Sequence, residues 1–451
     1  MTNVTNPKTN QPFKILWYGD GVALSGFGRI ANEVCRRLKR RGYSVQLASI
    51  QYTGHPTELI KELDWVWALG GRDIWNEITG IVNYTQPDIL ISCQDFPYHV
   101  NLFHGCRIDF SKLKWIGITP VDGVPIDPGW LKIIEQTDGF MTISEFGVEA
   151  FRQEGKRVDL CHPAADANEF YPLDDVERAK MREIAGYKPD DYVVGVVAMN
   201  QGRKAIPPMI EAFYEFAKDK PNAKLYLDMD DISPAGWHIP NLLKQMKWSE
   251  DEQKRIKYKK DMFTHPELLP LVNRYALMDA HMVISHREGF GLPLMEAQAC
   301  RIPVLALDYC SGTEICGDGR GLLVKTLPYR EYGTWGGAKD CYPDTVDLIV
   351  KLNQLYNNPA EAKAIAERGY QWARSYSWDT TTDEVERVIQ AALAKDRKVK
   401  AQHDVTNPAT EHLNDDRGRD SQAVDALRDY PVIQPTAKPD PLPDIVSTNG
   451  G

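Results

Sequence analysis

Two series of short apolar segments, each alternating with segments of helical spacing, constrain the fold of this chain more than any other feature. The first series runs from residues 14–19 (KILWYG) to residues 139–144 (GFMTIS), and the second from residues 192–199 (YVVGVVAM) to residues 321–324 (GLLV). Strands that alternate with helices in this way are typical of a parallel sheet with helices on both faces. Because the series restarts, and because 451 residues exceed one ordinary core, the sequence predicts an α/β chain with two doubly wound sheets.

The segment between the two series predicts where one domain ends. Residues 170–180 (FYPLDDVERAK) contain a proline and two aspartates, and we place a hinge between residues 171 and 175. Beyond residue 395 the chain is polar and then rich in proline, a composition typical of disorder. The predicted parts are a flexible N-terminus (1–13), an N-terminal domain (14–172), a C-terminal domain (173–370), C-terminal helices (371–395) and a disordered tail (396–451).

Composition argues against several classes of protein. The net charge of −10 and the pI of about 5.6 argue against a surface that binds nucleic acid throughout. The eight cysteines are scattered and form no C-x-x-C pair, so we expect neither a zinc cage nor a disulfide framework, which suits a reducing cytosol. The polar N-terminus lacks a signal core, and no apolar run approaches the roughly 18 residues that would span a membrane. We therefore expect a cytoplasmic protein without a transmembrane segment.

Two glutamates flank a glycine-rich turn in residues 285–304 (SHREGFGLPLMEAQACRIPV). Glu288 follows an apolar segment, which places it at the carboxyl edge of the predicted sheet, where open α/β sheets bind ligands. Gly289 and Gly291 leave backbone N–H groups accessible to an anion, and the N-terminus of the next helix adds partial positive charge. We expect Glu296 on the first turn of that helix. Both carboxylates could accept hydrogen bonds from a hydroxyl-rich ligand, although the pattern also fits an ordinary turn with two solvated glutamates.

Five motifs along the chain resemble, in the same order, those of retaining glycosyltransferases of family 4. EGFGLPLME (288–296) is similar to the family's E-x7-E signature, including its intervening glycines and proline. The other motifs that resemble family segments are HPAADANEFYP (162–172), RKAIPPMIEAFYEFAKDKPNAKLYL (203–227), SGTEICGDGRGLLV (311–324) and SYSWDTTTDEVERV (375–388). Each motif alone is degenerate, but five in the right order are specific. The resemblance covers roughly residues 14–393.

The resemblance implies the GT-B fold, in which two Rossmann-like domains face each other across a cleft and the final helices (371–395) cross back to the first domain. It implies a nucleotide-sugar donor in the C-terminal domain and an acceptor in the N-terminal domain. The expected reaction is transfer of a sugar with retention of anomeric configuration. It needs no metal ion or other cofactor if cationic side chains stabilise the leaving phosphate. The acceptor stays open: a glycan, a protein, a lipid-linked sugar, a small molecule or a nucleic-acid base.

The resemblance also implies roles for individual residues. Arg203 and Lys204 match the pair that neutralises the donor diphosphate. Glu288 matches the residue that contacts the sugar hydroxyls, and Glu296 matches the residue that binds the ribose. The backbone groups expected near the donor belong to Gly26, Gly289, Phe290 and Gly291.

One loop of the first domain departs from the family pattern. Related enzymes often carry a histidine after the strand that corresponds to residues 114–119, whereas this chain reads TPVDGVP (119–125) and offers Asp122. We expect Asp122 to be catalytic, as a carboxylate that orients the acceptor hydroxyl or holds the donor sugar, with His99 as the next candidate. No metal site is expected, because the nearest acidic run, DMDD (228–231), is interpreted as the end of a strand.

Two other functions remain open from the sequence. GFGRIA (26–31) fits G-x-G-x-x-A after a strand, a pattern found in NAD-dependent oxidoreductases. Against this, the loop over residues 19–26 is longer than a dinucleotide-binding turn, and the next strand (43–52) ends without the acidic residue that holds the adenine ribose. The second alternative is a catalytically inactive, GT-B-shaped binding protein. The complete set of two glutamates and an Arg-Lys pair argues against it.

The basic run RRLKRRG (36–42) also has more than one interpretation. It could contact anionic lipid at a membrane surface, or nucleic acid. It could equally be a solvated helix end whose cations complement the helix dipole. We favour the solvated helix end, because one-sided apolar anchors are lacking nearby.

Overall fold

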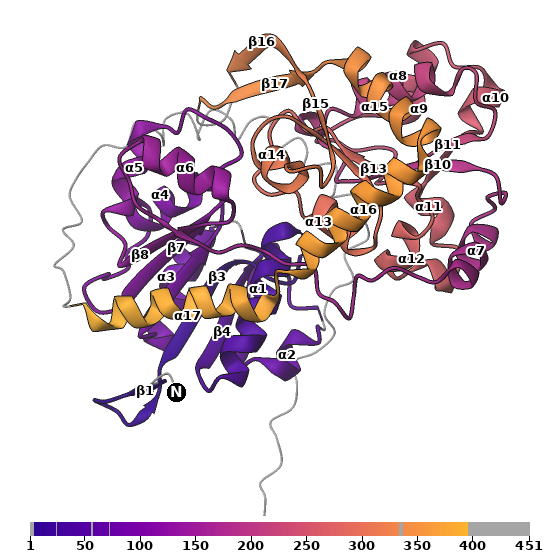
Figure 1. Ribbon diagram of the computed structural model, residues 1–451. Coiled ribbons are helices and arrows are strands. Elements are labelled where there is room, and N and C mark those ends of the chain that lie inside the picture. The colour runs from indigo at the N-terminus through magenta and orange to yellow at the C-terminus, as the bar shows by residue number, and fades with distance from the viewer. Residues whose placement is uncertain (1–3, 24, 56, 72, 333–336, 396–451) are drawn as a thin grey trace, which may run out of the picture. The chain divides into compact units, whose positions relative to one another are not determined.

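The computed structural model describes residues 4–23, 25–55, 57–71, 73–332 and 337–395 (Figure 1). The chain divides into two units, residues 1–403 and residues 404–451, and the second unit lies entirely outside the described residues. The predicted disordered tail (396–451) lies outside them too, as do residues 1–3 of the predicted flexible N-terminus. The first unit contains two separate parallel sheets, so the predicted α/β class with two doubly wound sheets is confirmed.

The first lobe (residues 14–160) is built on seven parallel strands in the order β5-β4-β3-β6-β7-β8-β9. Its central strand β3 (Lys14–Asp20) is buried on both faces: Ile15 and Trp17 pack into one apolar core, Leu16 and Tyr18 into another. Burial on both faces explains the continuous apolar run in the sequence. The remaining strands are β4 (Ser44–Ile50), β5 (Trp65–Leu69), β6 (Ile89–Cys93), β7 (Lys114–Thr119), β8 (Gly139–Thr142) and β9 (Asp159–Leu160). The helices are α1 (Gly26–Arg40), α2 (Leu59–Glu62), α3 (Ile74–Thr85), α4 (Phe96–His104), α5 (Pro128–Ile134) and α6 (Glu145–Gln153).

The second lobe (residues 175–374) has six parallel strands in the order β12-β11-β10-β13-β14-β15. From β10 the chain first runs outward through β11 and β12 and then returns to β13 on the other side. The junction between β10 and β13 is therefore a topological switch point, where open α/β sheets bind ligands. The strands are β10 (Tyr192–Val197), β11 (Ala223–Asp228), β12 (Ile256–Tyr258), β13 (Ala280–Val283), β14 (Val304–Leu307) and β15 (Leu322–Val324). The helices are α7 (Asp175–Ile184), η1 (Gly202–Lys204), α8 (Ile206–Ala217), α9 (Ile239–Gln245), α10 (Glu250–Gln253), α11 (Lys259–Met262), η2 (Pro266–Leu268), α12 (Leu271–Tyr275), α13 (Leu292–Ala299), α14 (Ser311–Cys316), α15 (Thr345–Asn357) and α16 (Pro359–Arg374).

Two antiparallel hairpins lie outside the parallel sheets. The first pairs β1 (Thr5–Asn6) with β2 (Gln11–Pro12), in a segment for which the sequence predicted flexibility. The second pairs β16 (Thr326–Tyr332) with β17 (Lys339–Pro343) and has no counterpart among the sequence-based expectations. The backbone N–H of Lys339 donates a hydrogen bond to the carbonyl oxygen of Val124 at 3.0 Å. The second hairpin therefore contacts a loop of the first lobe.

Helix α17 (Trp378–Ala394) follows the second lobe in sequence but packs against β7, β8 and α1 of the first (Figure 1). Val388 and Ile389 are buried in the same apolar core as Ile15 of β3. The contact is close, because a Cβ atom on Gly139 would lie only 2.5 Å from Val388 Cγ1. Glycine at this position of β8 lets the helix approach the sheet.

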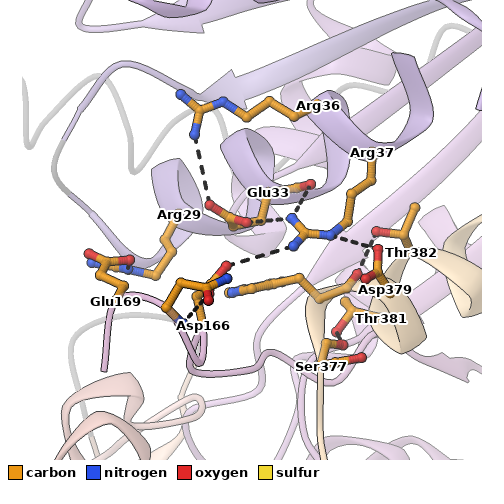
Figure 2. Close-up of polar contacts among 12 residues, drawn as sticks. Arg29, Glu33, Arg36, Arg37, Asp166, Glu169, Ser377, Asp379, Thr381 and Thr382 are labelled. Carbon is orange, nitrogen blue, oxygen red and sulfur yellow. Dashed lines mark hydrogen bonds and ion pairs between the residues drawn. The ribbon is translucent and has the colours of Figure 1, made fainter. Parts of the chain in front are cut away.

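The basic end of α1 carries ion pairs. Arg37 NH2 lies 3.7 Å from Asp166 Oδ2 in the connector, and Arg37 Nε lies 3.0 Å from Asp379 Oδ1 at the start of α17 (Figure 2). Arg41 NH1 contacts Glu386 Oε2 of α17 at 2.8 Å. The predicted helix end with cations in its last turn is confirmed, but these cations are only partly solvated, because Arg37 and Arg41 join α1 to α17 and to the segment between β9 and α7. Among the described residues, no helix has the length and apolar character needed to cross a membrane.

Candidate functional site

The turn between β13 and α13 places the two glutamates in different surroundings. Gly291 has a φ of +93°, a left-handed conformation that favours glycine, and it caps α13. Glu288 lies in the loop before the helix. Because the helix begins at Leu292, Glu296 is on its second turn, and the prediction that placed Glu296 on the first turn is wrong.

Glu288 lies within a cluster of charges, which we call the Glu288 cluster (Arg203, Lys204, Ser285 and Glu288). Its Oε2 atom accepts hydrogen bonds from Lys204 Nζ at 2.5 Å and from Ser285 Oγ at 2.9 Å, and lies 3.6 Å from Arg203 NH1. Burial alone would raise the pKa of Glu288, but the charges of Lys204 and Arg203 outweigh burial and lower this pKa to about 2. Burial and the nearby Arg203 lower the pKa of Lys204, and the ion pair with Glu288 opposes that shift. Glu288 is thus an ionised acceptor near neutral pH.

Two adjacent strands bring this cluster to one edge of the second sheet. Arg203 and Lys204 lie in η1, which follows β10, and Glu288 follows β13, the neighbouring parallel strand. The backbone N–H of His286 donates to the carbonyl oxygen of Arg203 at 2.8 Å, and Arg203 NH1 donates to the carbonyl oxygen of Arg287 at 3.2 Å. The Glu288 cluster therefore stands at the switch point of the sheet, where three of the predicted site residues meet.

Glu296 belongs to a separate polar group. Its Oε2 atom accepts a hydrogen bond from Tyr275 OH at 2.8 Å, and its Oε1 atom lies 3.5 Å from Arg29 Nε. Arg29 stands on α1 of the first lobe and also pairs with Glu169 at 2.7 Å (Figure 2). Burial raises the pKa of Glu296, although Arg29 opposes the shift. Within the described residues, no hydrogen bond or ion pair joins Glu296 to the Glu288 cluster.

Two of the three glycines predicted to lie near the donor, Gly26 and Gly289, fall where the two lobes touch. A Cβ atom on Gly26 would lie 3.6 Å from Leu292 Cδ1, so the start of α1 is beside the start of α13. A Cβ atom on Gly289 would lie 2.7 Å from Pro120 Cβ, which leaves no room for a side chain at this contact. The side chain of Phe290 is buried in the core, so only its backbone is available to a ligand.

Asp122 lines a cavity with a volume of about 380 Å³, within the range typical of small-molecule sites. Its side chain is 42% exposed, and its Oδ1 atom lies 3.9 Å from Arg287 NH1. Of the Glu288 cluster, Arg203 reaches this cavity. The lining residues are Asp95, Phe96, Pro97, Pro120, Val121, Asp122, Gly123, Pro125, Ile126, Trp130, Gln201, Arg203, Ala235, Arg287 and Ala338.

Asp95 also lines this cavity, and sequence reasoning missed it. Its side chain is exposed, but its place in the concave cavity wall still withdraws it from bulk water. The protein atoms around the carboxyl group remove part of its hydration, and this desolvation together with the nearby charge of Asp122 raises the pKa of Asp95 to about 6, with Arg203 opposing and Asp20 adding to the shift. The signal that could have found it is the segment SCQDFP (92–97), in which an acidic residue lies two positions after a buried strand, much as Asp122 lies three positions after another.

His99, the next candidate after Asp122 in the sequence, is a structural residue. It is fully buried, with Nδ1 at 2.8 Å from Ser92 Oγ and Nε2 at 3.0 Å from the carbonyl oxygen of Gln94. Burial lowers its pKa to about 4, so the ring is neutral near pH 7. His99 is not among the residues that line the cavity.

The acidic run at residues 228–231 begins at the end of β11. Asp228 is buried, and its Oδ2 atom accepts a hydrogen bond from Arg274 Nε at 2.6 Å. This carboxylate is therefore neutralised within the second lobe. Across the described ranges, no group of three or more His, Cys, Asp or Glu side chains is arranged to hold a metal ion.

Comparison with known sequences gives a family match in the second lobe. Residues 177–329 match the family model of group 1 glycosyl transferases. The D-inositol 3-phosphate glycosyltransferase of Rhodococcus jostii is 29% identical over 238 residues, which are 52% of this chain and 48% of that protein. The chain thus spans about half the length of the first curated relatives it matches. The putative glycosyltransferase EpsD of Bacillus subtilis is 23% identical over 309 residues, which are 67% of this chain and 71% of that protein.

Comparison with solved structures extends the likeness to both lobes. The sucrose-phosphate synthase of Thermosynechococcus elongatus superposes with a TM-score of 0.65 at 15% identity, over 84% of this chain and 99% of that chain. Anabaena HepE, solved in complex with UDP, superposes with a TM-score of 0.62 at 15% identity, over 84% of this chain and 100% of that chain. At this level of identity, the likeness shows a shared fold.

Proposed function

We propose that this chain transfers a sugar from a nucleotide-sugar donor to an acceptor hydroxyl, because residues 177–329 match the family model of group 1 glycosyl transferases and both lobes share the GT-B fold of solved glycosyltransferases. We further propose that the anomeric configuration is retained and that no metal ion takes part. The observation that carries the proposal is the Glu288 cluster, which gathers two cations and a carboxylate at the switch point of the second sheet.

The proposed chemistry uses the charges of this cluster. Breaking the anomeric bond leaves negative charge on the departing diphosphate, and cations already fixed at that position stabilise it. Arg203 and Lys204 supply that charge in place of a metal ion. The N-terminus of α13, capped by Gly291, adds the partial positive charge of the helix dipole, which favours an anion. Glu288 is ionised and would accept hydrogen bonds from the hydroxyls of the transferred sugar.

The choice of donor is tested first with UDP-sugars, because HepE was solved with UDP and with UDP-glucose. We expect the purified protein to release UDP from one of a panel of UDP-sugars in the presence of a chelator, and NMR to show a product with the anomeric configuration of the donor. Complete loss of activity in chelator would refute metal independence, and an inverted product would refute retention. Reduction of NAD by any substrate would favour the oxidoreductase alternative.

Glu296→Ala is expected to lower the affinity for UDP and the affinity for uridine to a similar degree, by about tenfold, because the proposed contact is to the ribose that both ligands contain. Calorimetric titration with the two ligands measures this. Arg29, which loses one partner in the variant, keeps its ion pair with Glu169, so the fold should persist. A loss confined to UDP would place Glu296 at the phosphates and contradict the ribose assignment.

Asp122→Asn is expected to lower turnover about tenfold while leaving UDP affinity unchanged, because the proposed partner of Asp122 is the acceptor or the transferred sugar. The effect is moderate because Asp122 is 42% exposed and lies near Arg287, so part of its charge is already screened. Initial rates at saturating donor test this. If the rate of Asp122→Asn equals that of the wild type, Asp122 only shapes its own loop.

A further inference from the structure

The cavity beside the Glu288 cluster has one aromatic wall. The rings of Phe96 and Trp130 are stacked, with centroids 5.4 Å apart and planes inclined by 16°. Phe96 is buried, whereas Trp130 on α5 is only partly buried and lines the cavity. Aromatic faces of this kind pack against flat, apolar surfaces, such as the C–H face of a saturated six-membered ring. The wall therefore suits a ring-shaped ligand.

The cations of the cavity are already engaged. Arg287 Nε lies 2.5 Å from Asp340 Oδ1 of the second hairpin, and Arg287 NH1 lies 3.9 Å from Asp122 Oδ1. Arg203 lies 3.6 Å from Glu288 and belongs, in the proposed function, to the donor diphosphate. These two arginines are the cations among the described residues that line the cavity. Neither arginine is therefore available to bind a phosphate group on the acceptor.

The anionic side of the cavity is different. Asp95 is the N-cap residue of α4, but its carboxylate makes no capping hydrogen bond there, and it forms no other hydrogen bond or ion pair with the described residues, although it lies in the wall of the cavity. The neighbouring carboxylate of Asp20 is occupied, because it accepts hydrogen bonds from Gln94 Nε2 at 2.9 Å and from Ser25 Oγ at 2.7 Å. The carboxylate of Asp95 is thus available to accept a hydrogen bond from a ligand, and its negative charge would repel a phosphate group.

We propose that this cavity binds the acceptor as an uncharged, hydroxylated six-membered ring, with Trp130 against the face of the ring and Asp95 accepting a hydrogen bond from one of its hydroxyls. The inference rests on the proposed function and adds the class of acceptor to it. A hydroxyl bonded to a carboxylate is held more firmly than one bonded to a neutral acceptor. The site thereby selects against a phosphorylated ring, in contrast to relatives whose names specify an inositol phosphate.

Binding of the ring should depend on pH through Asp95. The charged and titratable groups that face it are Asp122 after β7, Arg203 in η1, Asp20 at the end of β3 and Arg287 across the cavity. The pKa of Asp95 is about 6, so its carboxylate is ionised above that pH and protonated below it. Only the ionised form accepts the charge-assisted hydrogen bond, so affinity for the ring should fall as the pH is lowered through 6.

The test uses the full-length protein saturated with UDP and titrated with four probes, observed by ligand NMR. The probes are myo-inositol, myo-inositol 3-phosphate, methyl α-D-glucopyranoside and its 6-phosphate. We expect at least one neutral ring to bind, and its phosphorylated counterpart to bind about tenfold or more weakly. Tighter binding of the phosphorylated rings, or binding of neither neutral ring, would overturn the inference.

Variants locate the ring in the cavity. Asp95→Asn should lower the affinity for the neutral ring about tenfold or more and abolish its pH dependence near 6. Trp130→Ala should lower the affinity for the ring to a similar degree. Trp130→Phe keeps an aromatic face and should retain most of the affinity, which separates lost packing from lost folding. The matched controls are Glu135→Gln, an exposed carboxylate paired with Lys156, and Trp67→Ala, a tryptophan bonded to Gln46 in the first lobe. Both should bind the ring as the wild type does, and an equal loss in the controls would refute the assignment.

UDP affinity separates the two proposals. Every variant should bind UDP as the wild type does, because none of the substituted residues belongs to the donor site. A wild-type protein that binds no nucleoside diphosphate would refute the proposed function itself. A wild-type protein that binds UDP and turns over a UDP-sugar, but whose ring affinity is unaltered in Asp95→Asn and in Trp130→Ala, would refute only the inference about the acceptor.

Discussion

Lys204→Ala is expected to lower kcat/KM by roughly 10²–10³-fold, the range typical of losing one fixed group that stabilises charge in the transition state. Lys204 is buried, and it lies in η1, which follows β10, beside the proposed position of the diphosphate. UDP affinity should fall as well, by about 10- to 150-fold, because a contact between a cation and a phosphate contributes about 1.5–3 kcal/mol. Steady-state kinetics and calorimetric titration with UDP measure the two effects.

Lys220→Ala is the matched control for this variant. Lys220 is also buried in the second lobe and paired with a carboxylate, Asp219 at 2.6 Å, but it lies after α8, away from the switch point. The control should reproduce any loss of thermal stability that comes from removing a buried lysine, and it should leave UDP affinity unchanged. Lys204 would lose its proposed role if the two variants bound UDP equally well.

Glu288→Gln is expected to lower turnover by roughly 10²–10³-fold, because hydrogen bonds to a sugar hydroxyl that strengthen in the transition state contribute several kcal/mol. UDP affinity should stay the same or rise. The reason is structural: Glu288 holds Lys204 at 2.5 Å, and its neutral replacement leaves that cation free to bind the diphosphate. The contrast between unaltered UDP binding and lost turnover is the signature of this variant.

Ser285→Ala provides a graded companion to Glu288→Gln. Ser285 Oγ donates to Glu288 Oε2 at 2.9 Å, so its loss should loosen the carboxylate without removing it. We expect turnover between that of the wild type and that of Glu288→Gln, with UDP affinity unchanged. If Glu288→Gln weakens UDP as strongly as Lys204→Ala does, Glu288 contacts the nucleotide and the sugar assignment is wrong.

The parts of the fold that could be predicted from sequence depend on local patterns. Short segments such as residues 14–19 predict a strand because a continuous apolar run of this length is typical of a strand that is buried on both faces. The strand β3 is indeed buried on both faces. Arg203 and Glu288 could be predicted at one edge because parallel strands end together, and their contact follows from the adjacency of β10 and β13. Local pattern and strand direction were sufficient for these features.

The remaining features depend on contacts between distant segments. The hairpin of β16 and β17 is polar and irregular, and it is stabilised partly by a loop far away in sequence, at Val124. Asp95 was overlooked because its significance arises only when Trp130 and Asp122 close a cavity around it. Glu296 was placed one turn too early because the start of α13 is set by the left-handed conformation of Gly291, which the sequence alone does not reveal. Contacts of this kind, between segments far apart in the chain, cannot be read from a single sequence.

The docking of α17 on the first sheet has a consequence for synthesis of the chain. A ribosome makes the strands β3 to β9 early, yet Val388 and Ile389, which complete the core around them, appear more than two hundred residues later than the last of those strands, at Leu160. The nascent first lobe therefore cannot complete its apolar core until the second lobe and α17 have been synthesised, and part of its apolar surface stays exposed until then. Domains that fold during translation usually do so from the N-terminus, and exposed apolar surface makes waiting chains prone to aggregate. Chaperone demand during translation should accordingly be concentrated in the interval before α17 emerges.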